Sequence, residues 1–454
     1  MSKQQSIFAA YIDKYFRKTV GKVTELYNGR KTEEQYLHEQ LLDKEYTADL
    51  TWNSTTLNNS IVAADVVAMD SSLPLKKRSV ISTASGDVAK VGMKYQIREK
   101  EISDINIMRA KGQREADIAR KVLQNVPRAI KGVKIRMEIM FQQAFSQGFA
   151  LVQGDENEGT GVRADFGYLD SHTFHALAAG WSDSTNATPL DDIRQLITKA
   201  DEDGTKINHF YLSDTYFNYM RRTDQVKELV ATNNNQVIIS AATLPVPGRA
   251  KTLEALADEF DAQFHGVGSS FRIEKADGTH TTVKPWAVGN VVGCTSDKVG
   301  RLCWGTLAEE TNPVNGVDYQ KSDYILVSEY STNEPSLIEF TASQALAMPV
   351  IDNADEIFVL HADGTGVITV DPTTLNFTSA ANTTGKKVTV THSDKDWTAS
   401  VPAEATWCTV TTSGNQITVK VSANTGSGAT ARTTTLTVED TDGNKATVTI
   451  NQAA

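Results

Sequence analysis

The sequence has 454 residues, of which 40% are hydrophobic and 22% charged, and this ordinary globular usage excludes a disordered chain or a collagen-like fibre. One hydrophobic core rarely organises a chain of this length, so about three structural units are expected. The net charge of −11 argues against a protein whose task is to grip nucleic acid, because neutralising phosphates requires clustered lysine and arginine.

No window approaches the roughly 20 apolar residues of a membrane helix, and the N-terminus carries charges where a signal peptide would be apolar. We therefore expect a protein made and kept in the cytosol, with no membrane partner. Cys294, Cys303 and Cys408 are too few and too irregularly spaced for a disulfide framework or a zinc site. Reduced, buried thiols are expected.

The N-terminal part reads as an arm followed by an extended loop. Apolar side chains recur at helical steps over residues 7–27, which predicts an amphipathic helix, and the polar stretch that follows makes residues 1–64 an arm. Residues 65–112 contain short segments of alternating polarity, which favour an extended β loop. This loop carries a basic patch, formed by Lys76, Lys77 and Arg78.

The strongest helical signal follows a shorter predicted helix at residues 113–124. Its apolar stripe consists of Ile130, Val133, Met137, Met140, Phe141, Ala144 and Phe145. Its polar side consists of Lys131, Lys134, Arg136, Glu138, Gln142 and Gln143. Pro127 suits the first turn, where its missing N–H costs nothing, and Asn125 lies near enough to cap the helix.

The middle of the chain mixes helices and strands. Residues 151–180 are rich in glycine and loop-like, whereas 189–200 and 214–230 have helical patterns. Candidate strands lie at residues 209–212, 237–240, 288–293 and 324–328. The fold class expected for this part is α+β.

Residues 366–454 differ sharply in composition, being rich in threonine and in strand-forming residues without a helical period. Apolar alternation recurs at Leu375 and Phe377, Val388 and Val390, Ile417 to Val421, Leu436 and Val438, and Val448 and Ile450. Turn-forming sequences separate these segments at residues 382–385, 413–415, 424–428 and 442–444. The pattern predicts a self-contained all-β sandwich.

The known templates for catalysis and metal binding find no match. His172 and His175 lack a third ligand, and the glycine-rich stretch at residues 154–161 lacks the lysine of a phosphate loop. No nucleophile elbow or catalytic cysteine signature is present. We therefore expect no catalytic, cofactor or metal site, and a structural protein in place of an enzyme.

The order of arm, β loop, long helix and α+β block over residues 1–361 resembles major capsid proteins of tailed bacteriophages with the Hong Kong 97-type fold, most closely the lambda-type capsid family. The stretch at residues 73–80, the strand at 91–99 and the segment at 102–112 carry this likeness. The resemblance implies a capsid core at residues 113–361, with a spine helix, a peripheral domain and an axial domain near 180–320.

The resemblance further implies hexamers and pentamers that close an icosahedral shell around double-stranded DNA, in a virion assembled in the bacterial cytoplasm. Portal, scaffold or cement proteins would be further partners. Lys76, Lys77 and Arg78 would contact a neighbouring subunit, although an exposed basic turn explains them equally well. The arm and the β loop are expected to find their burial only against sister copies. No residue is assigned to covalent cross-linking.

The C-terminal part resembles the BACON domain, an immunoglobulin-like module of gut Bacteroidetes proteins. The residues that carry this likeness are Trp397, Trp407, Asn424, Arg432 and Gln452. The resemblance implies a phage of such hosts and raises glycan or mucus adhesion by a projecting domain. Sugar binding usually needs exposed aromatic platforms, whereas the aromatic residues here are Phe377, Trp397 and Trp407, and at least two of them are expected in the core.

Two other functions remain open at this point. The chain could be a phage tail or baseplate protein with an adhesive β domain, in which case it would form tubes or rings. It could also be a bacterial glycan-binding accessory protein, which the missing signal peptide disfavours.

Overall fold

The computed structural model describes residues 3–29, 36–56, 82–152, 162–234, 240–268, 270–275, 277–334, 336–364, 369–391, 397–402, 404–426, 428–440 and 445–454. The chain divides into two compact units. One consists of Met1–Thr173, Leu196–Asp214 and Leu256–Val359, and the other of Phe174–Gln195, Thr215–Ala255 and Leu360–Ala454. The α+β class expected from the sequence is confirmed. Within the described ranges, no helix is both long and apolar enough to span a bilayer.

A six-stranded sheet forms the centre of the first unit. Its strands are β1 (Leu42–Tyr46), β4 (Lys90–Ile97), β13 (Gly300–Gly305), β14 (Asp318–Ser322), β15 (Ile325–Thr332) and β16 (Ile338–Ile351). The order is β1-β13-β16-β15-β14, and β4 also pairs with β16. The 14-residue β16 therefore joins three strands, with β15 and β4 along its first part and β13 along its last part.

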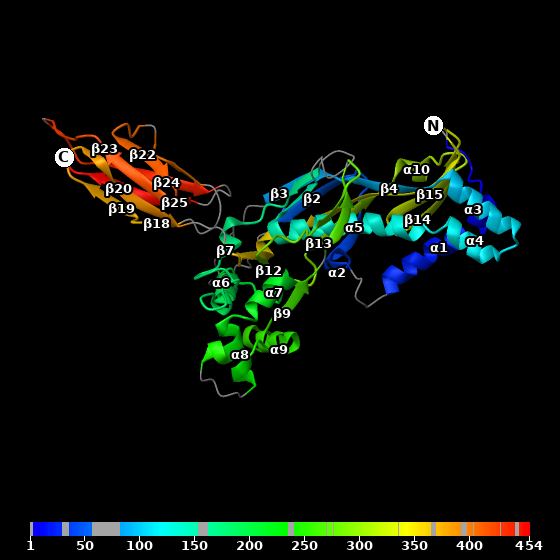
Figure 1. Ribbon diagram of the computed structural model, residues 1–454, viewed down its shortest axis with the longest axis horizontal. Helices are drawn as coiled ribbons and strands as arrows, with labels where there is room; N and C mark the ends of the chain where they lie inside the picture. Colours follow the sequence, from blue (N-terminus) through cyan, green and yellow to red (C-terminus); the bar gives the residue numbers. More distant parts are fainter. Residues whose placement is uncertain are drawn as a thin grey trace, which may run out of the picture. The chain divides into compact units, whose positions relative to one another are not determined.

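Helix α5 (Val126–Gln147) is the predicted long helix, and it packs on β16, β4 and β15 of this sheet (Figure 1). All seven residues of the predicted apolar stripe are buried. Pro127 lies in the first turn as expected, but the Asn125 side chain makes no capping hydrogen bond. The helix ends at Gly148, whose φ of 82° is a left-handed conformation that glycine adopts without strain.

Four helices precede α5 or lead into it: α1 (Ala9–Gly29), α2 (Leu37–Leu41), α3 (Glu99–Ala110) and α4 (Glu115–Val122). Helix α1 confirms the amphipathic pattern, but Ile12 and Phe16 of this helix, and Phe8 just before it, are buried within the same chain. The expectation that these residues find burial only against sister copies is therefore wrong for α1, because the chain supplies its own core for the stripe.

The extended β loop expected over residues 65–112 also differs from the structure. Strands β2 (Thr51–Thr56) and β3 (Ser82–Asp87) pair with each other, so the excursion starts before residue 65. β4 belongs to the central sheet, and residues 99–110 form α3. In segments this short, the alternation of a strand and the period of a helix are hard to tell apart. The sequence pattern therefore placed the boundaries of the extended loop wrongly.

The remaining strands of the first unit form a second sheet and two hairpins. In the second sheet, β17 (Ile357–His361), β12 (Asn290–Cys294), β8 (His209–Ser213) and β9 (Gln263–Val267) follow one another. The hairpins are β5 (Phe149–Val152) with β6 (Val162–Asp165), and β10 (Phe271–Glu274) with β11 (His280–Val283). Short elements are η1 (Asp170–His172), α10 (Ala308–Thr311) and η3 (Ala354–Glu356).

Between residues 173 and 260 the chain forms β7 (Thr173–His175), α6 (Pro189–Glu202), α7 (Asp214–Met220), α8 (Asp224–Asn233), η2 (Ala241–Thr243) and α9 (Arg249–Phe260). The helix predicted at 189–200 is confirmed, whereas the one predicted at 214–230 is two helices. The strand predicted at 237–240 lies mostly outside the described residues. Buried Asp192 accepts hydrogen bonds from Trp181 Nε1 and Leu177 N, both at 2.7 Å.

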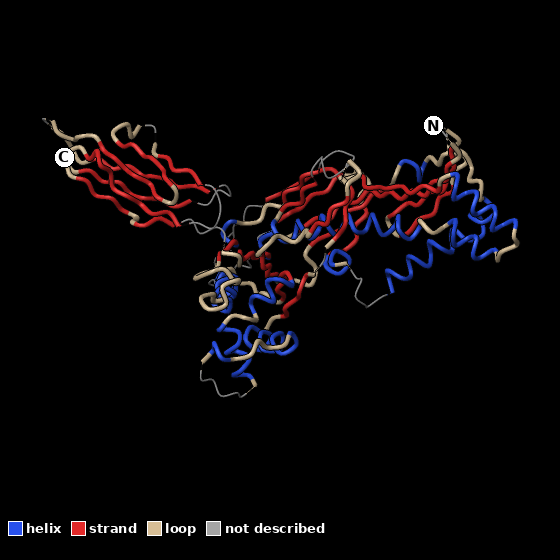
Figure 2. The backbone as a smooth tube through the Cα atoms, viewed as in Figure 1, coloured by secondary structure: helices blue, strands red, loops and turns tan. Residues whose placement is uncertain are grey.

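From residue 369 onward, Figure 2 shows only strands and loops among the described residues. One sheet has the order β18-β20-β23-β22 and the other β19-β25-β24-β21. The strands are β18 (Thr369–Asp371), β19 (Thr374–Phe377), β20 (Asn382–Thr391), β21 (Trp397–Ser400), β22 (Cys408–Ser413), β23 (Gln416–Val421), β24 (Arg432–Asp440) and β25 (Lys445–Gln452).

Both C-terminal sheets contribute to one apolar core, which contains every apolar pair predicted from the alternation. The turn expected at residues 382–385 is instead part of β20. There the register with β23 shifts between Asn382 and Lys386, and Gly385 has a φ of 86°. The turn chemistry of the sequence thus encodes a β-bulge.

Candidate functional site

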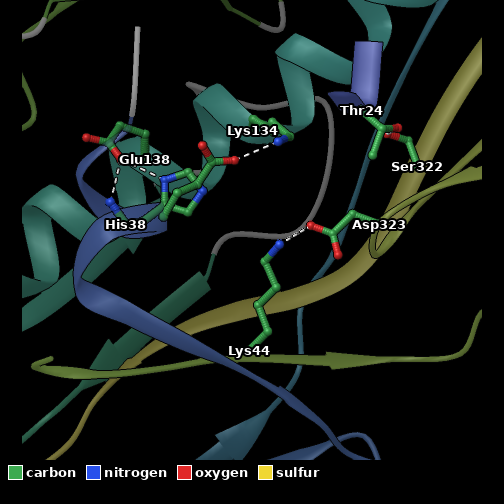
Figure 3. Close-up of polar contacts among 8 residues, drawn as sticks. Thr24, His38, Lys44, Lys134, Glu138, Ser322 and Asp323 are labelled. Carbon is green, nitrogen blue, oxygen red and sulfur yellow. Dashed lines mark hydrogen bonds and ion pairs between the residues drawn. The ribbon is translucent and has the colours of Figure 1, made fainter. Parts of the chain in front are cut away.

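A buried ionic network fastens α2 to the long helix α5, and Figure 3 shows His38, Lys134 and Glu138 of this network. The Glu138 carboxylate, on α5, accepts hydrogen bonds from His38 N at 3.0 Å and His38 Nδ1 at 2.7 Å. It also accepts bonds from Leu37 N at 3.1 Å and Gln142 Nε2 at 2.6 Å. His38 and Glu138 are each only 1% exposed. The carboxylate therefore occupies the N-terminal end of α2, where backbone N–H groups lack partners within the helix.

These contacts keep Glu138 ionised. Burial alone would raise its pKa, but the hydrogen bonds and the charge of His38 outweigh burial, so the pKa of Glu138 is lowered. Lys134, one turn earlier on α5, is also buried and its Nζ lies 2.6 Å from Glu39 Oε1. Two charged side chains of α5 thus find partners on α2.

Further polar contacts fasten the neighbouring segments (Figure 3). Lys44 forms an ion pair with Asp323, in the turn between β14 and β15. Thr24 Oγ1, on α1, lies 2.7 Å from Ser322 Oγ, at the end of β14. Residues on both sides of the interval 30–35 are therefore held by the same part of the central sheet.

The start of the chain forms a short ladder with β15. Gln4 N donates to Ser331 O at 3.0 Å, and Ser331 N donates to Gln4 O at 2.9 Å. Ser331 Oγ donates to Gln5 O at 2.8 Å. The first residues are therefore held by backbone pairing, before the apolar stripe of α1 begins.

An acidic row lies on β14, β15 and β16, which we define as Asp318, Glu329 and Glu339. Asp318 is the cross-strand partner of Glu329, and Glu329 is the partner of Thr341, whose Oγ1 donates to Glu329 Oε1 at 2.8 Å. The Ser6 side chain and the Ile7 backbone face Glu339. Glu329 and Glu339 are buried, and residues 4–7 lie next to this row, since Gln4 pairs with Ser331 of β15 and Ser6 and Ile7 face Glu339.

Burial raises the pKa of all three acidic-row carboxyls, for Glu329 to well above its usual value. The charged groups that act on Glu329 are Glu339 and Asp318, both of the same sign. Four carboxylate oxygens of the row have no hydrogen-bond partner among the described residues, namely Asp318 Oδ2, Glu329 Oε2 and both oxygens of Glu339. The row therefore favours protonated carboxyls, since ionised ones would be buried without a counter-charge.

The arrangement suits holding segments together and offers little for catalysis. A hollow of about 370 Å³ lies between α5 and residues 283–288, and its lining contains no carboxylate, histidine, cysteine or serine. It therefore lacks the carboxylate, histidine, cysteine and serine side chains on which most hydrolytic sites depend. Over the described ranges, no group of three histidine, cysteine or acidic side chains could hold a metal ion.

The two closely spaced histidines have structural surroundings. His172 Nε2 lies 3.0 Å from Asp203 Oδ2, and its ring stacks on Phe358. Burial lowers the pKa of His172 despite this carboxylate, so the neutral form is favoured. His175 stacks on His361.

The predicted β-loop contacts Lys76, Lys77 and Arg78 lie outside the described residues, as do residues 154–161. Of the five C-terminal signature residues, by contrast, four lie together at one corner of the sandwich: Trp407, Asn424, Arg432 and Gln452. Arg432 donates from Nε and Nη2 to Gln452 Oε1, at 3.0 and 2.9 Å, and its guanidinium lies 4.5 Å from the Trp407 ring centre.

Asn424 closes the same corner from the loop that follows β23. Its Nδ2 donates to Thr430 O and Ala453 O, both at 2.9 Å, and Gln452 Nε2 donates to Ser422 O at 2.9 Å. Trp397 lies on β21 and packs on the core. The corner thus fastens the last strand to the loop, and the arginine covers one face of Trp407.

The sequence pattern predicts Lys134, Glu138 and Gln142 on the polar side of the helix, yet all three are buried. Their spacing of four residues places them on one face, which was the available signal. The partner that buries this face, α2, lies about 100 positions earlier in the chain. The acidic row was missed for the same reason, since its members meet only through strand pairing.

A search of the curated proteins found no match. Among solved structures, a prophage protein of Escherichia coli CFT073 is similar at 13% identity and a TM-score of 0.46, over 75% of this chain and 98% of that one. A phage-related protein of Bordetella bronchiseptica RB50 has 11% identity and a TM-score of 0.42, over 76% and 97%. The capsid of cyanophage A-1(L) has 12% and 0.41, over 74% and 95%.

The family described as phage major capsid protein E matches residues 19–362, which is about three quarters of the sequence. The match includes α5, the central sheet and α2, which the ionic network joins to α5. The chain belongs to the phage major capsid protein E family.

Proposed function

We propose that this capsid protein assembles with copies of itself, as hexamers and pentamers, into the icosahedral shell of a tailed phage that encloses double-stranded DNA. The family match over residues 19–362 carries the proposal. The long helix α5 packed on a six-stranded sheet, with the separate β2–β3 pair, supports a Hong Kong 97-type fold of the lambda-like kind. Portal and scaffold or cement proteins complete such a shell.

The β2–β3 pair is the segment to which we assign contact between subunits. Residues 57–81 join these two strands and include Lys76, Lys77 and Arg78. In contrast, α1 has its apolar side buried in its own chain, so it contributes a fixed surface. In a closed ring of subunits, each contact joins two different surfaces of the same chain. The β2–β3 segment of one subunit and the fixed surface around α1 of its neighbour would provide two such surfaces.

Expression of the full chain, followed by negative-stain electron microscopy, tests the proposal. Closed shells or separate capsomers are expected. Tubes or stacked rings would instead assign the chain to a tail or baseplate, and a monomer at every concentration and salt tested would refute assembly.

The C-terminal sandwich is proposed to be an immunoglobulin-like domain of the BACON type that projects from the shell. The corner built by Trp407, Asn424, Arg432 and Gln452 supports this assignment, because it gives most of the signature residues one shared structural role. We infer decoration or stabilisation of the shell as its role. Trp397 and Trp407 pack on the core, which leaves little aromatic surface for sugars. Glycan-array signals with the full chain, lost on deletion of residues 366–454, would establish adhesion instead.

A further inference from the structure

The exposed side of the helices around α4 is basic, although the chain is acidic overall. Residues 9–24 contain four basic and one acidic side chain, and residues 99–131 contain eight basic and five acidic ones. The two stretches together therefore have a net charge of +6, which leaves −17 for the rest of a chain whose total is −11. Such segregation by sign marks a surface with a charged partner.

Packing brings the two stretches together. Helix α4 contacts α1 and α3, α1 also contacts α5, and Figure 1 shows the labels of α1, α3 and α4 gathered in one place. Lys14 Nζ of α1 lies 2.6 Å from Glu115 Oε2 of α4. The apolar sides of these helices, including Phe16 and Val122, are buried in the common core, so the charged sides face outward.

Several acidic side chains of this surface are already neutralised. Glu115 is paired with Lys14, and Asp117 lies 2.9 Å from Arg114 Nε and 3.4 Å from Arg120 Nη1. Other exposed cations form no ion pair within the described ranges. We define six of them as the cationic helix surface: Arg17, Lys18, Lys22, Arg109, Lys111 and Arg128.

We propose that the cationic helix surface contacts the phosphate backbone of the double-stranded DNA inside the shell. This inference rests on the proposed function, which places DNA beside the protein. Duplex DNA carries one negative charge per about 1.7 Å, and dispersed lysine and arginine bind it by releasing counterions, without regard to sequence. Because the rest of the chain is acidic, only the cationic helix surface attracts DNA. The shell is therefore expected to bind DNA weakly.

The composition of the surface favours DNA over a protein partner. Stable protein interfaces centre on apolar or aromatic anchors. Among the described residues of α1, α3 and α4, Ile107, at 51%, is the one large hydrophobic side chain that is strongly exposed. The surface offers charge with little apolar area, which is what backbone contacts to nucleic acid require.

Fluorescence anisotropy with a random-sequence duplex and the purified full chain tests the proposal. The variant combines Arg17→Gln, Arg109→Gln, Lys111→Gln and Arg128→Gln. The matched control removes four exposed cations elsewhere: Lys90→Gln, Lys251→Gln, Arg272→Gln and Lys387→Gln. We expect the variant to bind about tenfold or more weakly at low salt, with a salt slope reduced by about 3 to 4, and the control to bind as the native chain does.

Three results would overturn the proposal: no salt-dependent binding by the native chain, equal losses in variant and control, or competition by polyglutamate as effective as that by unlabelled duplex. The last result would assign the surface to an acidic protein. Electron microscopy of the same samples distinguishes a failure of the DNA-contact proposal from a failure of the proposed assembly. Shells from a variant that binds DNA poorly would leave assembly intact, whereas absence of shells from the native chain would count against assembly alone.

Discussion

Asp318 and Glu329 lie directly opposite each other on β14 and β15, and burial raises the pKa of both carboxyls. Acids whose pKa is raised by folding bind more protons in the native state than in the unfolded state. Their contribution to stability is therefore fully present at low pH and is lost as the pH rises from the usual value of 4.5 for Glu329 through the raised one. Docking of the N-terminal segment on the acidic row should weaken over the same range.

Replacement of Glu329 by glutamine should remove this pH dependence. At pH 8 we expect Glu329→Gln to raise the free energy of unfolding by roughly 1 to 3 kcal/mol, because a neutral amide replaces a charge that is costly to bury. At pH 4 the difference should nearly vanish. Urea unfolding followed by tryptophan fluorescence measures both values. Exposed Glu334→Gln is the control, and a variant less stable than the native chain at both pH values would contradict the expectation.

Glu138 should behave in the opposite way. Glu138→Ala leaves the His38 ring and two backbone N–H groups without their acceptor, and we expect a loss of about 3 to 5 kcal/mol at pH 7. Because folding lowers the pKa of Glu138, its contribution is present above the usual value of 4.5 and is lost as the pH falls through the lowered one. Denaturant melts at pH 7 and pH 3, with exposed Glu99→Ala as control, measure the effect. An equal loss at both pH values would mean that packing alone accounts for it.

Charge reversal in the segment between β2 and β3 tests contact between subunits. The triple variant Lys76→Glu, Lys77→Glu and Arg78→Glu should block shell closure and leave the thermal unfolding of the unassembled chain unchanged. Electron microscopy and calorimetry read the two effects separately. Lys90→Glu, Lys251→Glu and Lys387→Glu change the charge equally and should still yield shells. Normal particles from the first triple variant would reduce its residues to an exposed basic turn.

Removal of the C-terminal sandwich tests whether it is an appendage. The sandwich has its own core, so a chain that ends at residue 365 should still assemble. Particle yield by sedimentation and particle shape by microscopy are the measurements. Failure of the shortened chain to assemble, while it remains folded by circular dichroism, would make the sandwich an integral part of the wall.

The corner around Arg432 should stabilise the sandwich. Arg432→Met keeps much of the aliphatic side chain but removes the donors to Gln452 and Ser422, so we expect the C-terminal transition to lose about 2 to 3 kcal/mol. Arg432→Lys should recover only part of this, because an ammonium cannot reproduce the planar fork. Calorimetry of the full chain resolves the transition, and Lys445→Met, at an exposed position, is the control. An unchanged transition for Arg432→Met would refute the role.

The sequence predicted those features that depend on neighbours a few positions apart. The stripe from Ile130 to Phe145 and the alternation from Leu375 to Ile450 both correspond to buried faces. Features that depend on distant partners were not predictable from periodicity. Glu138 looked like a solvent-facing residue because the helix that covers it is about 100 positions away. Gly385 looked like a turn because a bulge requires the same left-handed backbone.

Strand β16 also bears on when the protein becomes competent to assemble. It is paired with β4, which ends some 240 positions before it begins, and with β13 and β15. During synthesis, residue 346 must emerge from the ribosome before β4 is fully paired with β16, and pairings between such distant segments form slowly. The central sheet of a nascent chain therefore stays incomplete until about residue 351 has been synthesised. Only copies with a complete sheet present the surfaces that contact other subunits.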